Sequence, residues 1–221
     1  MDITYLGHAS FRLKGKNTTL VTDPYELEKV GLKFPKHVMA DVVTVSHDHP
    51  DHNAFHQIEG TPYVIHGPGE YEVKGVGVIG TTSFHDDEKG AKRGKNTIYR
   101  IEMDGLSIVH LGDLGHTLSA DEVDALDGVD ILMIPVGGHF TINPTAAVSV
   151  INEIEPSIVI PMHYKRDDMT GLPAQAGDAF KDLATVQMFL KEIGKEDVVA
   201  QPKLSVTKDK LPEQMQVVVL S

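Results

Sequence analysis

The chain has 221 residues, 41% of them hydrophobic, and carries a formal net charge of −12 with no cysteine. This composition allows a sizeable core, excludes disulfides and thiolate metal ligands, and disfavours a general electrostatic attraction to nucleic acid or an acidic membrane. No apolar stretch approaches the ~20 residues of a membrane span and the start lacks signal-peptide features, so we expect a single cytoplasmic domain over residues 1–221.

The first part of the chain is rich in strand signals. Alternating or β-branched apolar runs, separated by glycine, proline and asparagine turns, are typical of strands. The predicted strands cover residues 3–13, 18–23, 41–46 and 62–66, with a hairpin within 71–83. The run at 41–46 has four β-branched residues at its centre, Val42 to Val45, which predicts a buried strand that leads directly into His47.

Strands alternate with helices in the rest of the chain. Asp104-Gly105 is a hairpin signal, Ser119 with Glu122 predicts a capping box, and Asn143 before Pro144 is typical of a helix start. The predicted elements are a polar loop at 86–96, strands at 97–102, 106–111, 130–136, 157–161, 203–207 and 215–220, helices after 119, at 144–154 and near 180–193, and a loop at 165–178. This order favours an α/β protein with mixed sheets.

Histidine is unusually abundant, with 12 residues, and its placement is informative. His47, His139 and His163 each follow a predicted apolar strand. Ligands in α/β folds gather at the carboxyl ends of strands, and histidine is the commonest metal ligand. We therefore expect these loops to converge on one site.

The densest cluster is Ser46-His47-Asp48-His49-Pro50-Asp51-His52. In an extended loop alternate residues point the same way, which places His47, His49 and Asp51 on one side while His52 can point elsewhere. Imidazole and carboxylate groups suit zinc, manganese or iron. More distant residues usually complete such a site; the candidates are His85, His110, Asp113, His116, His139 and His163.

The segment from His47 to His52 resembles the H-x-H-x-D-H signature of the metallo-β-lactamase superfamily. Gly112-Asp113 after a strand resembles its fourth motif, and His163 after SIVIPM resembles its fifth. The strings LGHASF, VTDP, IPVGG and IPMHY resemble the branch that contains ascorbate-phosphate lactonase-like hydrolases. The resemblance covers nearly the whole chain and implies an αββα sandwich, with two mixed β-sheets flanked by helices.

The resemblance also implies a dinuclear metal site. It assigns His47, His49 and His85 to one divalent ion, Asp51, His52 and His163 to the other, and Asp113 to a bridge between them. Zinc is the expected metal, with manganese or iron as alternatives.

Two histidines compete for the third motif. His85 precedes a glycine-containing loop and a strand, as the branch requires. His110 lies three residues before Asp113 and would face away from that carboxylate in an extended strand, although a bend at Gly112 would remove this objection. His85 is preferred, and the choice stays open.

These features predict a metal-dependent hydrolase. A hydroxide that bridges the two cations would attack an ester, lactone or phosphodiester bond, with Asp51 orienting it. His139 and His116 are candidate proton donors, and His116 is also a candidate for contact with the substrate. Asp23 and Asp48 are candidate hydrogen-bond acceptors for the ligand imidazoles, although turn formation or helix capping explains them equally well.

Arg93, with Lys89, Lys92 and Lys95, forms a local positive patch that predicts contact with a small anionic substrate. A solvated loop, balanced by the acidic residues 86–88, is the alternative. A nuclease, a di-iron redox protein and a non-catalytic metal-binding scaffold are alternative functions. The charge of −12 counts against the first, and retention of all seven proposed ligands counts against the last. A homo-oligomer is compatible with the sequence.

Overall fold

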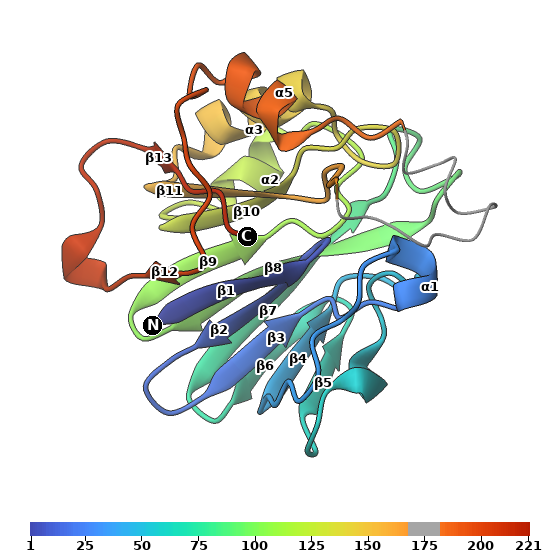
Figure 1. Cartoon of the computed structure of the whole chain (residues 1–221), viewed down its shortest axis with the longest axis vertical. Coiled ribbons are helices and arrows are strands. Elements are labelled where there is room, and N and C mark those ends of the chain that lie inside the picture. The colour runs from blue at the N-terminus through green and yellow to red at the C-terminus, as the bar shows by residue number, and fades with distance from the viewer. Residues whose placement is uncertain (168–181) are drawn as a thin grey trace.

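The computed structural model describes residues 1–167 and 182–221. Two β-sheets lie face to face, as Figure 1 shows. The strand order is β12-β1-β2-β3-β4-β5 in the six-stranded sheet and β13-β11-β10-β9-β8-β7-β6 in the seven-stranded sheet. Two mixed sheets flanked by helices are the architecture that we predicted from the sequence.

The six-stranded sheet contains most of the first third of the chain. Its strands are β1 (Asp2–Gly7), β2 (Ser10–Lys14), β3 (Thr19–Thr22), β4 (Val42–Val45), β5 (Tyr63–His66) and β12 (Leu204–Ser205). Strands β12, β1, β2 and β3 pair antiparallel, whereas β3, β4 and β5 are parallel. The carboxyl ends of these three parallel strands therefore share one edge of the sheet.

The seven-stranded sheet has the same mixed character. Its strands are β6 (Gly69–Val73), β7 (Val76–Phe84), β8 (Lys95–Met103), β9 (Leu106–His110), β10 (Ile131–Pro135), β11 (Ile158–Met162) and β13 (Gln216–Val217). Strands β6 to β9 form an antiparallel meander, and β9, β10, β11 and β13 are parallel.

Helices flank the sheets, and two of them, those that begin after Ser119 and Asn143, start where the sequence predicts. They are α1 (Leu27–Val30), α2 (Ala120–Asp124), α3 (Pro144–Ile154) and α5 (Val186–Glu192), with 3-10 turns η1 (Phe55–Gln57) and η2 (Lys208–Lys210). Ser119 and Glu122 form the predicted capping box, and the Asn143 side chain accepts a hydrogen bond from the Ala146 N–H. In the described part of the chain, no helix is both long and apolar enough to cross a membrane.

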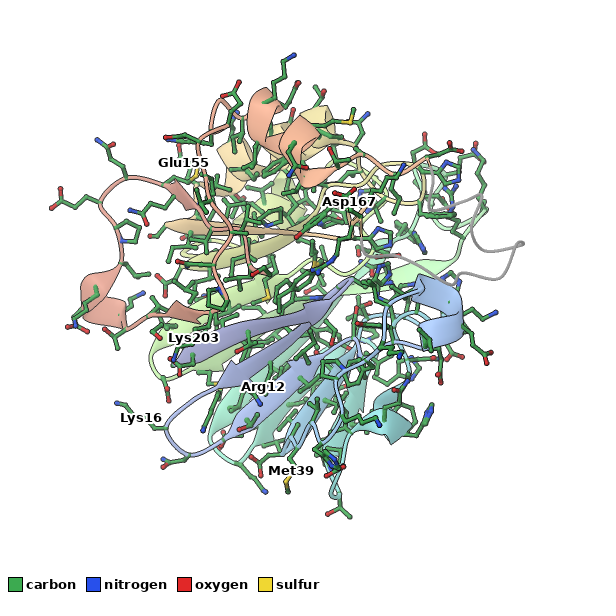
Figure 2. All side chains as sticks on the ribbon, viewed as in Figure 1. Arg12, Lys16, Met39, Glu155, Asp167 and Lys203 are labelled. Carbon is green, nitrogen blue, oxygen red and sulfur yellow. The ribbon has the colours of Figure 1, made fainter. Side chains whose placement is uncertain are left out.

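The main core lies between the sheets and under the helices. Side chains such as Ile3, Phe11 and Ile108 are completely buried there, while charged residues such as Lys16 and Lys203 project from the periphery (Figure 2). Burial of this apolar surface is the main force that holds the sheets together.

A second, smaller core covers the outer face of the six-stranded sheet. Val21 and Val43 point into it, whereas their neighbours Leu20 and Val42 point into the main core. Strands β3 and β4 are thus buried on both faces, which explains their continuous apolar runs. On this side the helical cover includes the single turn α1, and much of the remaining cover comes from irregular chain around Phe34.

One local prediction was wrong. Residues 3–13 are two antiparallel strands, β1 and β2, joined by a tight turn in which Gly7 and His8 have φ values of 117° and 55°. A side chain at Gly7 would collide with the Tyr25 ring, because an added Cβ would lie 2.3 Å from its hydroxyl oxygen. Of the predicted 180–193 helix, the structure shows residues 186–192. Residues 168–178 of the predicted loop lie outside the described residues.

Candidate metal centre

The Asp113 carboxylate lies at the centre of a group of imidazoles. Its Oδ2 atom is 3.2 Å from His52 Nε2, 3.2 Å from His85 Nε2, 3.3 Å from His163 Nε2 and 3.9 Å from His47 Nε2. Asp113 is only 1% exposed. One buried oxygen thus faces four ring nitrogens from three separate stretches of chain, as expected of a carboxylate shared between cations.

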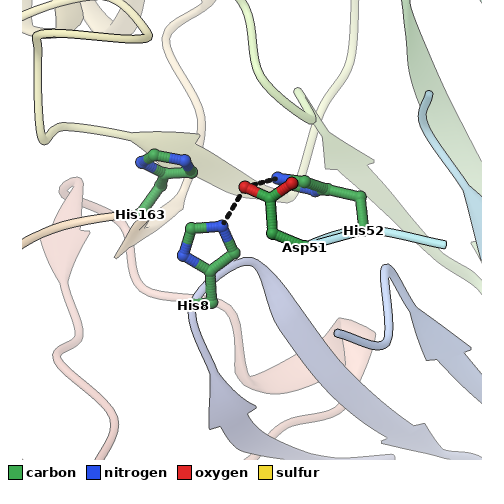
Figure 3. Close-up of side chains that lie close together, drawn as sticks. All are labelled: His8, Asp51, His52 and His163. Atoms are coloured by element: carbon green, nitrogen blue, oxygen red, sulfur yellow. Dashed lines mark ion pairs between the residues drawn. The ribbon is translucent and has the colours of Figure 1, made fainter. Parts of the chain in front are cut away.

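Two groups of donor atoms lie on either side of Asp113. The first group is His47, His49 and His85; the second group is Asp51, His52 and His163. Within each group the donor atoms lie within 4.8 Å of one another. Figure 3 shows the second group with His8, which lies against it. The groups come together where β4, β7, β9 and β11 end, because His47, His85, Asp113 and His163 follow these strands and the three imidazoles lie within 3.9 Å of the Asp113 carboxylate.

A bend in the chain after β9 presents Asp113 to the site. Gly112 has a φ of +55°, and an added Cβ would lie 2.3 Å from Asn96 Oδ1 and 2.7 Å from Ser46 Cβ. Only glycine fits this close approach without strain. The Asn96 side chain accepts a hydrogen bond from the Asp113 N–H at 2.9 Å and donates one to Leu111 O, which fixes the bend.

Asp23, at the end of β3, orients one imidazole of each group, His52 directly and His47 through Ser46. It is completely buried and accepts hydrogen bonds from Ser46 N (2.8 Å) and Ser46 Oγ (2.5 Å). It also lies 2.8 Å from His52 Nδ1. Burial raises the pKa of Asp23, but the His52 and Ser46 contacts lower it by more, so the carboxylate is charged. His52 therefore donates through Nδ1 and keeps a lone pair on Nε2.

Hydrogen bonding also determines which ring nitrogen of His47 carries the proton. Because the Ser46 hydroxyl donates its proton to Asp23, its oxygen accepts from His47 Nδ1 at 2.9 Å. His47 Nε2 then carries a lone pair and lies 3.0 Å from His49 Nδ1. Burial, with His52 next in effect, lowers the pKa of His47 to about 3, so the ring is neutral. A neutral imidazole with a lone pair facing the site is the form that binds a metal.

The donor set fits divalent cations. His52 Nε2 and Asp113 Oδ1 are buried without a hydrogen-bond partner among the described residues. His52 Nε2 faces the Asp113 carboxylate, so two electron-rich atoms oppose each other and a cation is needed nearby. Burial lowers the pKa of His52, but Asp113 and Asp51 raise it well above its usual value, so a proton takes that place when no metal is bound.

Known proteins resemble this chain along its length. A family model described as the β-lactamase superfamily domain matches residues 2–163. A UPF0173 metal-dependent hydrolase of Staphylothermus marinus is 33% identical over 194 residues, 73% of this chain and 82% of its own. The corresponding protein of Thermoplasma acidophilum is 29% identical over 219 residues, 88% of this chain and 97% of its own.

A solved structure agrees with these relatives. It comes from Thermotoga maritima and is described as a candidate Zn-dependent hydrolase of the metallo-β-lactamase superfamily. It matches with a TM-score of 0.78 and 36% identity, covering 99% of this chain and 97% of that one. The chain belongs to the metallo-β-lactamase superfamily. The predicted family and class, a metal-dependent hydrolase of this superfamily, are confirmed.

The superfamily's third motif is the position that the sequence left open. His85, at the end of β7, brings Nε2 to 3.2 Å from Asp113 Oδ2 and belongs to the first group. His110 faces elsewhere: its Nε2 donates to Ala9 O at 2.8 Å, and its Nδ1 accepts from the Gly112 N–H at 3.2 Å. The geometry favours His85 as the ligand and gives His110 the task of joining the β1–β2 turn to the Gly112 bend.

Substitution of these two histidines should affect different properties, metal content for His85 and stability for His110. We expect His85→Ala to lower the metal content of purified protein, because the first group loses one of three donors. His110→Ala should keep the metal but lose about 1–3 kcal/mol of stability, because a buried carbonyl and N–H lose their partner. Metal analysis and chemical unfolding check both outcomes. Loss of metal only in His110→Ala would reverse the assignment.

The loop after His85 is organised by Asp86. This buried carboxylate accepts hydrogen bonds of 2.7–2.9 Å from the backbone N–H groups of Glu88, Gly90, Lys92 and Arg93. Burial raises its pKa, but these bonds lower it by more, to about 2. The loop that carries the predicted positive patch is therefore folded around one carboxylate.

Acid should open this loop. Because the pKa of Asp86 is lowered in the folded state, its stabilising effect is full above the ordinary value of about 3.9 and is lost as the pH falls towards 2. We expect hydrogen-exchange protection of the Gly90 and Arg93 amides to fall over that range in metal-free protein. In Asp86→Asn the protection should be low already at pH 5; equal protection in both proteins at pH 5 would contradict this account.

The remaining predicted site residues lie outside the metal-ligand groups. His139 is exposed on the loop after β10, and its ring contacts Phe140 at 4.4 Å between centroids. The ring nitrogens of His116 lie against the backbone, accepting from Phe84 N at 3.3 Å and donating to Thr117 O at 2.9 Å. Contact of His116 with substrate therefore gains no support, and proton donation by His139 stays a prediction.

Arg93 and Asp48 also have defined surroundings. The Arg93 guanidinium donates to His139 O at 3.0 Å and lies 5.7 Å above the centre of the Phe140 ring. Asp48 is exposed and accepts from the Asn53 side chain at 2.5 Å, so it caps its own loop. Of the two predicted acceptors for ligand imidazoles, the structure gives that position to Asp23 alone.

Sequence reasoning gave no site role to three residues. Asn96 and Ser46 hold the backbone or side chains of ligands. His8 lies with the second group, although its place inside an apparent strand suggested a structural role. The glycine before it was a usable signal, because an isolated glycine in a strand pattern often marks a bulge or close backbone approach.

Proposed function

We propose that this protein is a dinuclear hydrolase that cleaves an ester, lactone or phosphodiester bond in a small anionic molecule. The observation that carries the proposal is the buried Asp113 carboxylate between two groups of donor atoms. The proposed ligands are His47, His49 and His85 in the first group, Asp51, His52 and His163 in the second, and Asp113 as the bridge.

The two metals and the two carboxylates have different roles in the proposed reaction. Two bound divalent cations, with zinc expected first and manganese or iron as alternatives, would lower the pKa of a shared water and polarise the scissile bond. The Asp113 side chain is 2% exposed, so water cannot reach it and its negative charge would serve to bind the two cations. The Asp51 side chain is 23% exposed. Asp51 is therefore the carboxylate that can orient the attacking water and accept its proton.

A cavity beside the first group supports an anionic substrate. It has a volume of about 360 Å³, and its lining includes His47, His49, Arg93 and Lys95. Arg93 is held in place by His139 O and the Phe140 ring, so its guanidinium is preorganised beside the proposed metals. A fixed guanidinium in a cavity of this size suits one phosphate or carboxylate group of a small molecule.

Removal of Arg93 should weaken substrate binding more than chemistry. A charge-assisted hydrogen bond contributes about 1.5–3 kcal/mol, so Arg93→Ala should raise KM for an anionic substrate roughly 10–100-fold with a small change in kcat. Lys92→Ala is the matched control, because Lys92 is exposed and pairs with Glu88 at 2.7 Å. Steady-state kinetics decide; equal effects of the two substitutions would assign the patch to a solvated loop.

A substrate panel tests the proposal as a whole. Metal-replete protein is assayed with lactones, phosphodiesters and carboxylic esters, with thioesters as a further class, beside His47→Ala and Asp51→Ala. We expect turnover of at least one anionic member of the panel and its loss in both variants. Hydrolysis that survives both substitutions would contradict the mechanism. The cytoplasmic location stays a prediction from the sequence.

A further inference from the structure

The turn between β1 and β2 delivers an imidazole to the second group. His8 is completely buried at this turn, in the left-handed conformation with φ 55°. Its carbonyl oxygen accepts hydrogen bonds from Tyr5 Oη at 2.8 Å and from His163 N at 2.9 Å. The backbone of His8 is thus tied directly to the backbone of a proposed ligand, which leaves its ring little freedom.

The ring of His8 lies among the donors of the second group, as Figure 3 shows. His8 Nε2 is 3.4 Å from Asp51 Oδ2, and the ring centroids of His163 and His52 are 4.2 Å and 4.9 Å from that of His8. A donor atom of His8 lies within 4.8 Å of a donor atom of each member of the group. The 3.4 Å between His8 Nε2 and Asp51 Oδ2 matches two ligands of one cation, because atoms at 2.0–2.1 Å from zinc lie about 3.4 Å apart in a tetrahedron.

The local backbone is held in strained conformations. His8, Asp23 and His163 have φ values of 55°, 36° and 53°, where residues other than glycine are uncommon. Such strain persists only where the surrounding structure over-determines it, and it concentrates at ligand-holding sites. Two of these three residues already have a place in the metal centre, as ligand and as orienting carboxylate. His8 shares their conformation and their location.

We propose that His8 is an additional ligand of the metal ion held by the second group. This inference rests on the proposed dinuclear site and adds an asymmetry to it. With the Asp113 bridge, the second group then offers five protein donors and the first group offers four. A metal with more protein ligands is held more tightly, whereas a metal with fewer protein ligands leaves more of its coordination shell to water and substrate. The second group should therefore fill first and release its metal last.

Direct coupling between nuclei tests the ligation without an activity assay. Protein labelled with ¹⁵N-histidine is loaded with ¹¹³Cd, and scalar coupling between cadmium and each ring nitrogen is recorded. His8 is assigned by through-bond correlation to its own backbone in the wild-type protein, so the test does not depend on a variant that folds. We expect a single cadmium resonance to couple to ring nitrogens of His8, His52 and His163.

The outcomes separate this inference from the proposed function. Coupling to His52 and His163 without coupling to His8 would overturn the inference and make His8 a hydrogen-bonding neighbour of Asp51. Absence of coupling to all three would overturn the proposed site as well. As a second measurement, His8→Gln should weaken the tighter of two metal-binding steps at least about 10-fold. His37→Gln, at an exposed histidine that pairs with Glu59 at 2.7 Å, should leave that step unchanged; equal effects of the two substitutions would count against ligation.

Discussion

Replacement of Asp113 by asparagine should abolish hydrolysis and weaken the binding of both metal ions. The Asp113 Oδ2 atom faces both groups, 3.2 Å from His52 Nε2 and 3.2 Å from His85 Nε2. Asparagine keeps the shape but removes the negative charge that two adjacent cations require. The two cations would then lie close together without a negative charge between them.

The expected effect of Asp113→Asn is large. Outer partners of metal ligands already contribute 10–100-fold to affinity or activity, so loss of the bridge should cost more than about 100-fold in both. Isothermal titration of metal into apoprotein and kcat/KM of reconstituted enzyme measure it. Asp130→Asn is the matched control, because Asp130 is a buried aspartate that pairs with Lys208 and caps Ser107 N. Metal affinity in Asp113→Asn within a factor of two of the control would contradict the bridging role.

Asp23→Asn should disable the site without removing any proposed ligand. In the native protein Asp23 accepts from His52 Nδ1, which leaves the lone pair on His52 Nε2. An asparagine amide at this position would donate to Nδ1 and so force the proton onto Nε2, where it blocks metal binding. Ser46 would also lose the acceptor that holds its hydroxyl proton away from His47.

Both groups should respond to Asp23→Asn, because Asp23 orients His52 directly and His47 through Ser46. We expect a loss of about 10–100-fold in metal affinity and a matching loss of activity, with the fold intact by circular dichroism. Asp48→Asn supplies the control, since Asp48 is a nearby exposed aspartate that contacts Asn53. The tautomer account is wrong if Asp23→Asn binds metal as tightly as Asp48→Asn.

The elements that create the site were predictable because their signals are local. The apolar run at 42–45 next to the histidine cluster at 47–52 identified a buried strand that feeds a metal-binding loop. The helix starts at Ser119 and Asn143 follow from capping chemistry within four residues. The superfamily resemblance then supplied the distant proposed ligands His85 and His163, which no local pattern connects.

Other features depended on long-range contacts that the sequence does not display. Residues 3–13 read as one strand apart from the signal at Gly7, and the turn at His8 becomes clear only from its contacts with Tyr25 and His163 in the structure. His116 follows Asp113 closely in sequence, yet backbone partners from Phe84 and Thr117 occupy its ring. The thin helical layer over β3 and β4 likewise depends on how residues around Phe34 cover an apolar face.

Anomalous X-ray scattering from crystals of zinc-reconstituted protein tests the central claim most directly. Data collected on both sides of the zinc absorption edge locate the bound ions without reference to activity. We predict two peaks about 3.5–4 Å apart, one beside His47, His49 and His85, the other beside Asp51, His52 and His163, with Asp113 between them. A single peak, or peaks away from Asp113, would contradict the dinuclear site.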